Sequence, residues 1–152
     1  MVGRRELWQN ISNFFPGNLA WYVVGDFNTI VDAREKKGGS ELCRTPIQEF
    51  NDFIASNGLL DMGFIGGRNT WCNNRKGNRR IWSRIDRWHG NIQCLDSFPQ
   101  TLVNHLPRTL SDHSPIVIKI IREQSGREHF IYSGNWVMVY GFKKMVQHSW
   151  LQ

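Results

Sequence analysis

Residues 19–28 read LAWYVVGDFN, a continuous apolar run that ends in a Gly-Asp-Phe-Asn turn sequence. A short apolar run bounded by turn residues predicts a strand buried in a sheet. The end of that strand would present the polar side chains of Asp26 and Asn28. Because Gly, Asp and Asn dominate turns, the alternative is that these two residues only close a tight turn.

The segments on either side of this strand predict helices. After it, Thr45 as N-cap, Pro46 at the first helical position and Gln48 in a capping box predict a helix that ends at Asn57-Gly58. Before it, apolar residues recur at helical spacing until Pro16-Gly17-Asn18 stops them, namely Leu7, Trp8, Ile11, Phe14 and Phe15.

Four later segments have strand character and are separated by Gly- and Asn-rich turns: residues 70–72, 80–87, 102–106 and 115–121. Strands that alternate with helices predict an α/β or α+β domain. A polar stretch at residues 122–126 marks a boundary. We therefore expect one domain at residues 1–121, followed by a linker and partly helical tail at residues 122–152.

The overall composition is that of a globular protein with a basic surface. The chain has 152 residues, a formal net charge of +6 and three cysteines. This charge favours polyanions such as DNA. The cysteines lack C-x-x-C spacing, so we expect reduced thiols. The longest apolar stretch is too short to cross a bilayer, and the N-terminus resembles no signal peptide. We expect an intracellular protein, nuclear or cytoplasmic, with no membrane partner and no small-molecule cofactor.

Several short motifs follow one another along the chain. They are Gly25-Asp26-Phe27-Asn28, Thr70-Trp71-x-Asn73, Arg84-Ile85-Asp86-Arg87 and Ser111-Asp112-His113-Ser114-Pro115. Together they resemble the endonuclease/exonuclease/phosphatase superfamily. The intervening Glu-Lys-Lys-Gly-Gly at 35–39 and His-Leu-Pro-Arg at 105–108 narrow the resemblance to the LINE-type retrotransposon endonucleases of plants. It runs from about Leu7 to Ile121, and the tail resembles the segment that joins such an endonuclease to a reverse transcriptase.

The resemblance implies a DNase I-like α/β sandwich of the α+β class. Members carry an Asn and a Glu on strands upstream of the Gly-Asp-Phe-Asn strand, and that Glu is the main ligand of Mg²⁺ (or Mn²⁺). Here a helix is expected in that region. The resemblance therefore implies a partial domain, with one sheet, flanking helices and a second sheet largely missing. It implies weak metal binding, inactivity alone, and a complementary N-terminal half or reverse transcriptase region as partner.

The resemblance also assigns roles to individual residues. Asp26 would orient or deprotonate the attacking water, and Asn28 would donate a hydrogen bond to the phosphate. His113 would contact the scissile phosphate, Asp86 would hold one of its ring nitrogens, and Asp112 would lie beside the metal. The structural residues expected near the site are Thr70, Trp71, Asn73 and Ser111. In isolation, Asp86 also fits a surface ion pair, and Asp112-His113 also fits a solvated loop.

A basic run interleaved with Trp82 and Trp88 predicts contacts to the DNA backbone, and a solvated hairpin is the alternative. The run consists of Arg75, Lys76, Arg79, Arg80, Arg84 and Arg87. Five or six phosphate contacts would give a log–log salt slope of about −5.

Three functions follow from these patterns. The first is a fragment of a Mg²⁺-dependent DNA endonuclease that nicks the target site of a retrotransposon. The second is a non-catalytic remnant that binds nucleic acid weakly. The third, a phosphatase of the same superfamily, fits less well, because residues 82–87 read Trp-Ser-Arg-Ile-Asp-Arg and lack the Trp-Cys-Asp-Arg motif of those enzymes.

Overall fold

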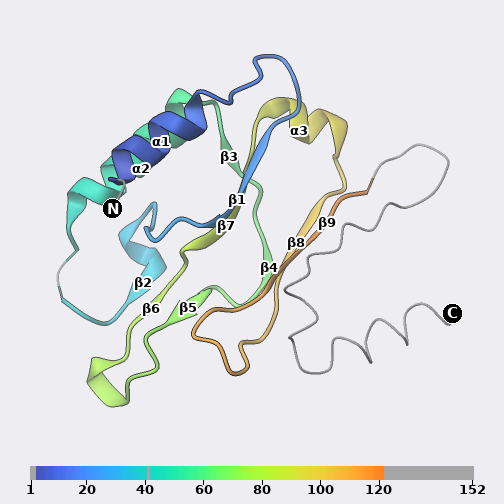
Figure 1. Ribbon diagram of the computed structural model, residues 1–152. Helices are drawn as coiled ribbons and strands as arrows, with labels where there is room; N and C mark the ends of the chain where they lie inside the picture. Colours follow the sequence, from blue (N-terminus) through green and yellow to red (C-terminus); the bar gives the residue numbers. More distant parts are fainter. Residues whose placement is uncertain (1–2, 41, 122–152) are drawn as a thin grey trace, which may run out of the picture.

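The structure is a computed structural model that describes residues 3–40 and 42–121, so the expected tail at residues 122–152 lies outside it. The described residues form an α+β arrangement with three small sheets (Figure 1). No helix among them is both long and apolar enough to span a membrane.

Two helices pack against each other on one side of the structure (Figure 1). α1 (Arg4–Ser12) is shorter than predicted, so Phe14 and Phe15 lie beyond its end. α2 (Arg44–Ser56) begins one residue before Thr45, with Cys43 as its N-cap. The predicted capping box is therefore wrong: the Gln48 side chain instead donates to Asp52 one turn further along.

The first sheet has the order β1-β7-β3, with β7 (Asp86–Gly90) antiparallel to both β1 (Tyr22–Asp26) and β3 (Leu60–Asp61). β1 lies at the edge of this sheet. The prediction that it is buried is wrong, because Tyr22 and Val24 on its outer face are 42% and 48% exposed. β1 carries apolar side chains on both faces, but only one of these faces packs against the aromatic core.

The expected single sheet is replaced by three small ones. The second has the order β2-β6-β5 and the third β4-β8-β9. Their strands are β2 (Lys36–Lys37), β6 (Trp82–Ser83), β5 (Trp71–Cys72), β4 (Ile65–Gly66), β8 (Leu102–His105) and β9 (Ile116–Lys119). The short helical elements are η1 (Ala33–Glu35), η2 (Gly77–Arg79) and α3 (Ile92–Ser97).

The predicted strand at residues 80–87 is split into β6 and β7 for an identifiable reason. At the break, the Arg84 N–H donates to the carbonyl of Glu35, and the Ile85 N–H donates to the side chain of Thr70. The backbone N–H groups at the break thus bond to η1 and to the Thr70 side chain instead of continuing one ladder. The two halves of the segment consequently belong to different sheets.

The hydrophobic core lies between the helices and the inner face of the first sheet. It consists of Trp8, Phe27, Phe50, Phe53 and Leu59. The four aromatic rings pack against one another, with centroid distances of 4.9 Å for both Trp8–Phe53 and Phe27–Phe50. Each fully buried large apolar side chain contributes about 2 kcal/mol to folding. This aromatic cluster therefore joins α1 and α2 to β1.

His89 on β7 completes this core in an unusual way, because its ring is polar. It is 1% exposed and meets Phe27 and Phe50 edge-on. Neither ring nitrogen has a hydrogen-bond partner among the described residues. Burial lowers the pKa of His89 to about 4, although the nearby carboxylate of Asp61 opposes that shift. The folded protein therefore holds this imidazole neutral.

The buried imidazole predicts acid sensitivity. Below about pH 6.5 the unfolded chain binds a proton at His89 that the folded chain does not bind until about pH 4, so stability falls across this window. The loss is about 3 kcal/mol relative to His89→Phe, which keeps the aromatic contacts. Urea unfolding of both proteins between pH 7 and pH 4 measures it. Parallel losses in the two proteins would contradict the assignment.

Candidate functional site

The centre of the site is a contact between Asp86 and His113. The Nδ1 atom of His113 lies 3.1 Å from Oδ2 and 3.2 Å from Oδ1 of Asp86, so the predicted pairing is present. Asp86 is the first residue of β7, and His113 lies in the loop before β9. Their side chains are 14% and 33% exposed. The pair is therefore sheltered on the carboxylate side and open to solvent on the imidazole side.

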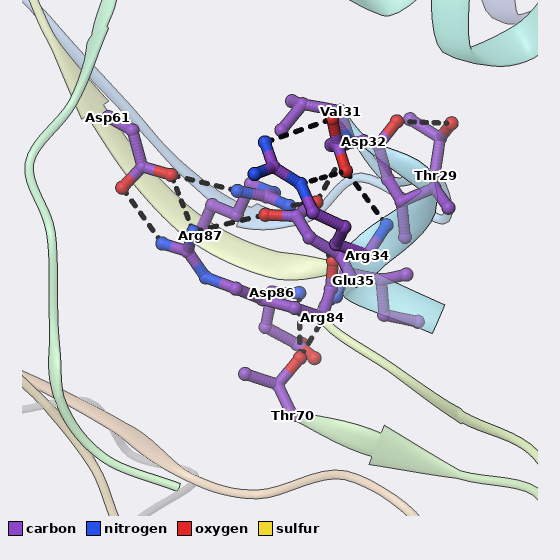
Figure 2. Close-up of polar contacts among 12 residues, drawn as sticks. Thr29, Val31, Asp32, Arg34, Glu35, Asp61, Thr70, Arg84, Asp86 and Arg87 are labelled. Atoms are coloured by element: carbon purple, nitrogen blue, oxygen red, sulfur yellow. Dashed lines mark hydrogen bonds and ion pairs between the residues drawn. The ribbon is translucent and has the colours of Figure 1, made fainter. Parts of the chain in front are cut away.

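Thr70 holds both members of this pair. Its hydroxyl oxygen accepts hydrogen bonds from the backbone N–H groups of Ile85 and Asp86, each at 3.0 Å (Figure 2). Its carbonyl accepts from the N–H of Ser114 at 2.6 Å, one residue after His113. Thr70 is fully buried. One rigid residue thus sets the distance between two segments that lie far apart in the sequence.

The loop that carries His113 has further anchors. Ser111 accepts a hydrogen bond from the backbone of His113 at 3.0 Å, and Trp71 forms an isolated bridge with His113. The Trp71 indole N–H donates to Asp112 at 3.0 Å, which lowers the pKa of that carboxyl below its ordinary value. The Asp112 carboxylate therefore accepts a hydrogen bond from the Trp71 indole.

Asp26 lies beside this pair because of the strand register. It is directly opposite Asp86 in the β1–β7 ladder. The neighbouring Phe27 N–H bonds to the carbonyl of Ile85, so the two aspartates form a non-hydrogen-bonded pair, whose Cβ atoms lie about 5 Å apart on one face. Asp26 and Asp86 therefore project from the same end of the same sheet face.

Asn28 follows in a turn that Asp26 closes. The Asn28 N–H donates to Oδ1 of Asp26 at 2.8 Å, and Asn28 has a φ of 50°. The tight turn that the sequence left as an alternative is thus present, and it coexists with the proximity of Asp26 to Asp86. The turn fixes the position of the Asp26 carboxylate.

The potential magnesium ligands at this site are the carboxylate oxygens of Asp26 and Asp86. Mg²⁺ requires oxygen ligands in a nearly octahedral array. Across residues 3–40 and 42–121 there is no group of three or more His, Cys, Asp or Glu side chains that could hold a metal ion. One oxygen of Asp26 accepts from Asn28, and both oxygens of Asp86 face His113.

Arg84 and Arg87 are not on the surface, which corrects the expectation that they contact DNA. They are 6% and 0% exposed. Arg84 pairs with both oxygens of Asp61 at 2.7 and 2.8 Å and also contacts Glu35 (Figure 2). Arg87 pairs with Glu35 and, at 2.8 Å, with Asp61. The four side chains form an ion cluster with balanced charge, in which Arg84, Arg87 and Glu35 are buried and the Asp61 side chain is 32% exposed. We call it the buried ion cluster.

This buried ion cluster explains the ionisation of its members. Burial alone would raise the pKa of Asp61, but the hydrogen bond and charge of Arg84 outweigh burial and lower it. Burial lowers the pKa of the Arg87 guanidinium, and the charge of Glu35 opposes that shift. Glu35 also accepts from the N–H of Val31 at 3.0 Å. The sequence motif at residues 35–39 includes Glu35, but the spacing of that motif does not indicate that Glu35 pairs with Arg84 and Arg87.

The other four basic residues of the predicted DNA-binding run are exposed, namely Arg75, Lys76, Arg79 and Arg80. They lie on the hairpin loop between β5 and β6. Asn73 organises this loop, because its Oδ1 accepts from the N–H groups of Arg75 and Ile81 and its Nδ2 donates to the carbonyl of Arg79. We call these four residues the basic hairpin.

No protein-family model matches the chain, and no curated protein is significantly similar to it. The resemblance to LINE-type endonucleases therefore stays a prediction from motifs. The geometry of Asp26, Asp86 and His113, together with the basic hairpin, carries the functional argument.

The buried ion cluster predicts a large stability effect. Glu35→Gln leaves two buried arginines with one carboxylate, so we expect a loss of about 3 kcal/mol in the free energy of unfolding. The control Arg34→Gln breaks an ion pair in which the arginine is 81% exposed, and its unfolding midpoint should match the wild type. Urea denaturation compares them. Equal midpoints for both variants would refute a structural role for the cluster.

Proposed function

We propose that this chain carries the aspartate–histidine side of a Mg²⁺-dependent DNA endonuclease centre. The observation that carries the proposal is the Asp86–His113 pair, which lies beside Asp26 at one end of a sheet face. A carboxylate, a carboxylate-bound imidazole and an adjacent basic loop suit phosphodiester hydrolysis, which needs an oriented water and stabilised phosphoryl charge.

The Asp86 carboxylate would fix which nitrogen of the His113 ring holds a proton. When Nδ1–H donates to Asp86, the position of the proton on that nitrogen is fixed. A ring that carries a second proton, on Nε2, would donate it in a hydrogen bond to a non-bridging phosphate oxygen. Asp26 would accept the proton of the attacking water as the new P–O bond forms, and the departing deoxyribose oxygen would take a proton from solvent water as the old bond breaks.

The basic hairpin favours DNA as the polymer that supplies this phosphate. It connects β5 to β6, and Trp71 of β5 bridges to His113. The strands that position the imidazole therefore also position four cationic side chains. Such contacts to the backbone carry no sequence information. We expect sequence-independent binding.

The second candidate is a non-catalytic remnant that binds nucleic acid weakly, and it requires only the exposed basic hairpin. Both candidates share the basic hairpin and predict DNA binding. They differ in whether Asp86 and His113 have a chemical role. Only the endonuclease proposal predicts cleavage once further metal ligands are supplied.

DNA binding should be weak and depend strongly on salt. Because Arg84 and Arg87 are buried, four phosphate contacts remain, and log Kd against log salt concentration should have a slope of magnitude about 4 instead of about 5. Fluorescence anisotropy with a labelled duplex measures this slope. Replacing Arg75 and Arg79 by Gln should reduce its magnitude by about 2. Tight binding that is insensitive to salt would contradict the proposal.

Plasmid nicking tests the endonuclease role. In millimolar Mg²⁺ the chain alone should nick supercoiled plasmid no faster than background. An N-terminal half of a LINE-type endonuclease, added in trans to supply the glutamate ligand, should produce nicking that EDTA abolishes. Within that mixture, His113→Ala should slow nicking by about 10²–10³-fold, as expected for the loss of one transition-state contact.

A matched pair of aspartate variants provides the control. Asp86→Asn should slow nicking, whereas Asp96→Asn, on the exposed surface of α3 beyond the opposite end of β7, should not. EDTA-sensitive, His113-dependent nicking by the chain alone would show that its own residues hold the metal. A lack of nicking in the mixture, with DNA binding intact, would favour the non-catalytic remnant.

A further inference from the structure

Leu110 is the most exposed of the large apolar side chains in the described part of the chain, at 97%. It lies in the loop that joins β8 to β9, three residues before His113. A single exposed leucine is ordinary on a protein surface and needs no explanation by itself. Its meaning depends on how firmly the loop is held and on what surrounds it.

The loop is anchored on both sides of Leu110. At its base, the Leu106 N–H donates to the carbonyl of Pro115 at 2.9 Å. Before the tip, the Arg108 guanidinium lies over the Trp82 ring, 5.1 Å from its centroid, and donates to the carbonyl of Cys72 at 3.4 Å. After the tip, the backbone carbonyl of Asp112 accepts from Cys72 at 2.9 Å. Leu110 is therefore presented on a braced loop.

The same anchors join the loop that carries Leu110 to the basic hairpin. Arg108 also donates to the side chain of Asn74, the residue before Arg75, and Arg80 lies 5.8 Å from the Trp82 ring centroid that Arg108 contacts. The apolar tip thus lies on a loop that is bonded to the cationic one. An apolar protein surface would leave these cations without a partner of opposite charge. A nucleic acid offers phosphates to the cations and stacked bases to the leucine.

We infer that Leu110 is an apolar wedge that inserts between adjacent base pairs of duplex DNA and kinks it. This inference rests on the proposed function, because it assumes that the basic hairpin holds DNA. Proteins that insert Leu, Ile, Met or Phe between base steps unstack them partially and bend the duplex by about 20–90°. Insertion close to His113 would open the backbone next to the phosphate that this imidazole contacts.

Ligase-catalysed cyclisation of short DNA tests the wedge without knowledge of a target sequence. A duplex of about 120 bp is shorter than the persistence length of about 150 bp, so it closes poorly unless it is bent. At equal occupancy of this duplex, the wild-type chain should raise the yield of circles roughly threefold or more, as expected for a kink in this range. Leu110→Ala should reduce the yield of circles to that of free DNA. The salt dependence of DNA binding by this variant should equal that of the wild type.

Two further variants make the test specific. Leu110→Met keeps a wedge-forming side chain and should retain the enhancement. Ile65→Ala removes another exposed side chain, 57% exposed on β4, and should behave like the wild type. Because Leu110 is almost fully exposed, its replacement should leave the unfolding midpoint unchanged.

The outcomes distinguish a failure of the wedge hypothesis from a failure of the proposed DNA binding. Salt-dependent binding without enhanced cyclisation, or full enhancement by Leu110→Ala, would overturn the wedge alone. A lack of salt-dependent binding would overturn both. If Leu110→Ala altered the sedimentation of the protein but not cyclisation, Leu110 would belong to a protein–protein contact and the wedge would be refuted.

Discussion

The structure depends on neutralising two arginines that it buries on either side of Asp86. A buried charge without a partner strongly destabilises a folded protein. Arg84 and Arg87 must therefore pair with carboxylates in the folded chain. Glu35 and Asp61 supply them from η1 and from β3. This requirement brings three distant segments together and fixes the start of β7. Asp86 owes its position to the balanced charges around it.

Anchoring to a common residue is the second principle of the site. Thr70 binds the backbone at Asp86 through its hydroxyl and the backbone beside His113 through its carbonyl. Loops are ordinarily the more mobile parts of a protein. Here Trp71 and Arg108 brace the loop around His113 from two sides. The site consequently combines loop residues with fixed geometry, which is the preorganisation that electrostatic stabilisation of a phosphate needs.

Sequence patterns located several elements of this site. The order of the motifs predicted that Asp86 would reach His113, and the strand ending in Asp26 was expected from its apolar run. Charge, by contrast, misled: six basic residues in one run predicted one DNA-binding surface, yet Arg84 and Arg87 point into the protein. Burial depends on which segments pack above a strand, and a run of cations contains no information about distant carboxylates.

The sequence by itself determined that helices and strands are mixed along the chain, and it placed the two main helices to within a few residues, because these features follow from local periodicity and turn preference. Only the tertiary structure decided that the strands divide into three sheets and that Glu35 and Asp61 neutralise the arginines. It also decided that Leu110 stands exposed on a braced loop. Register, burial and ion pairing arise between segments that are distant in the chain, and local preferences do not encode them.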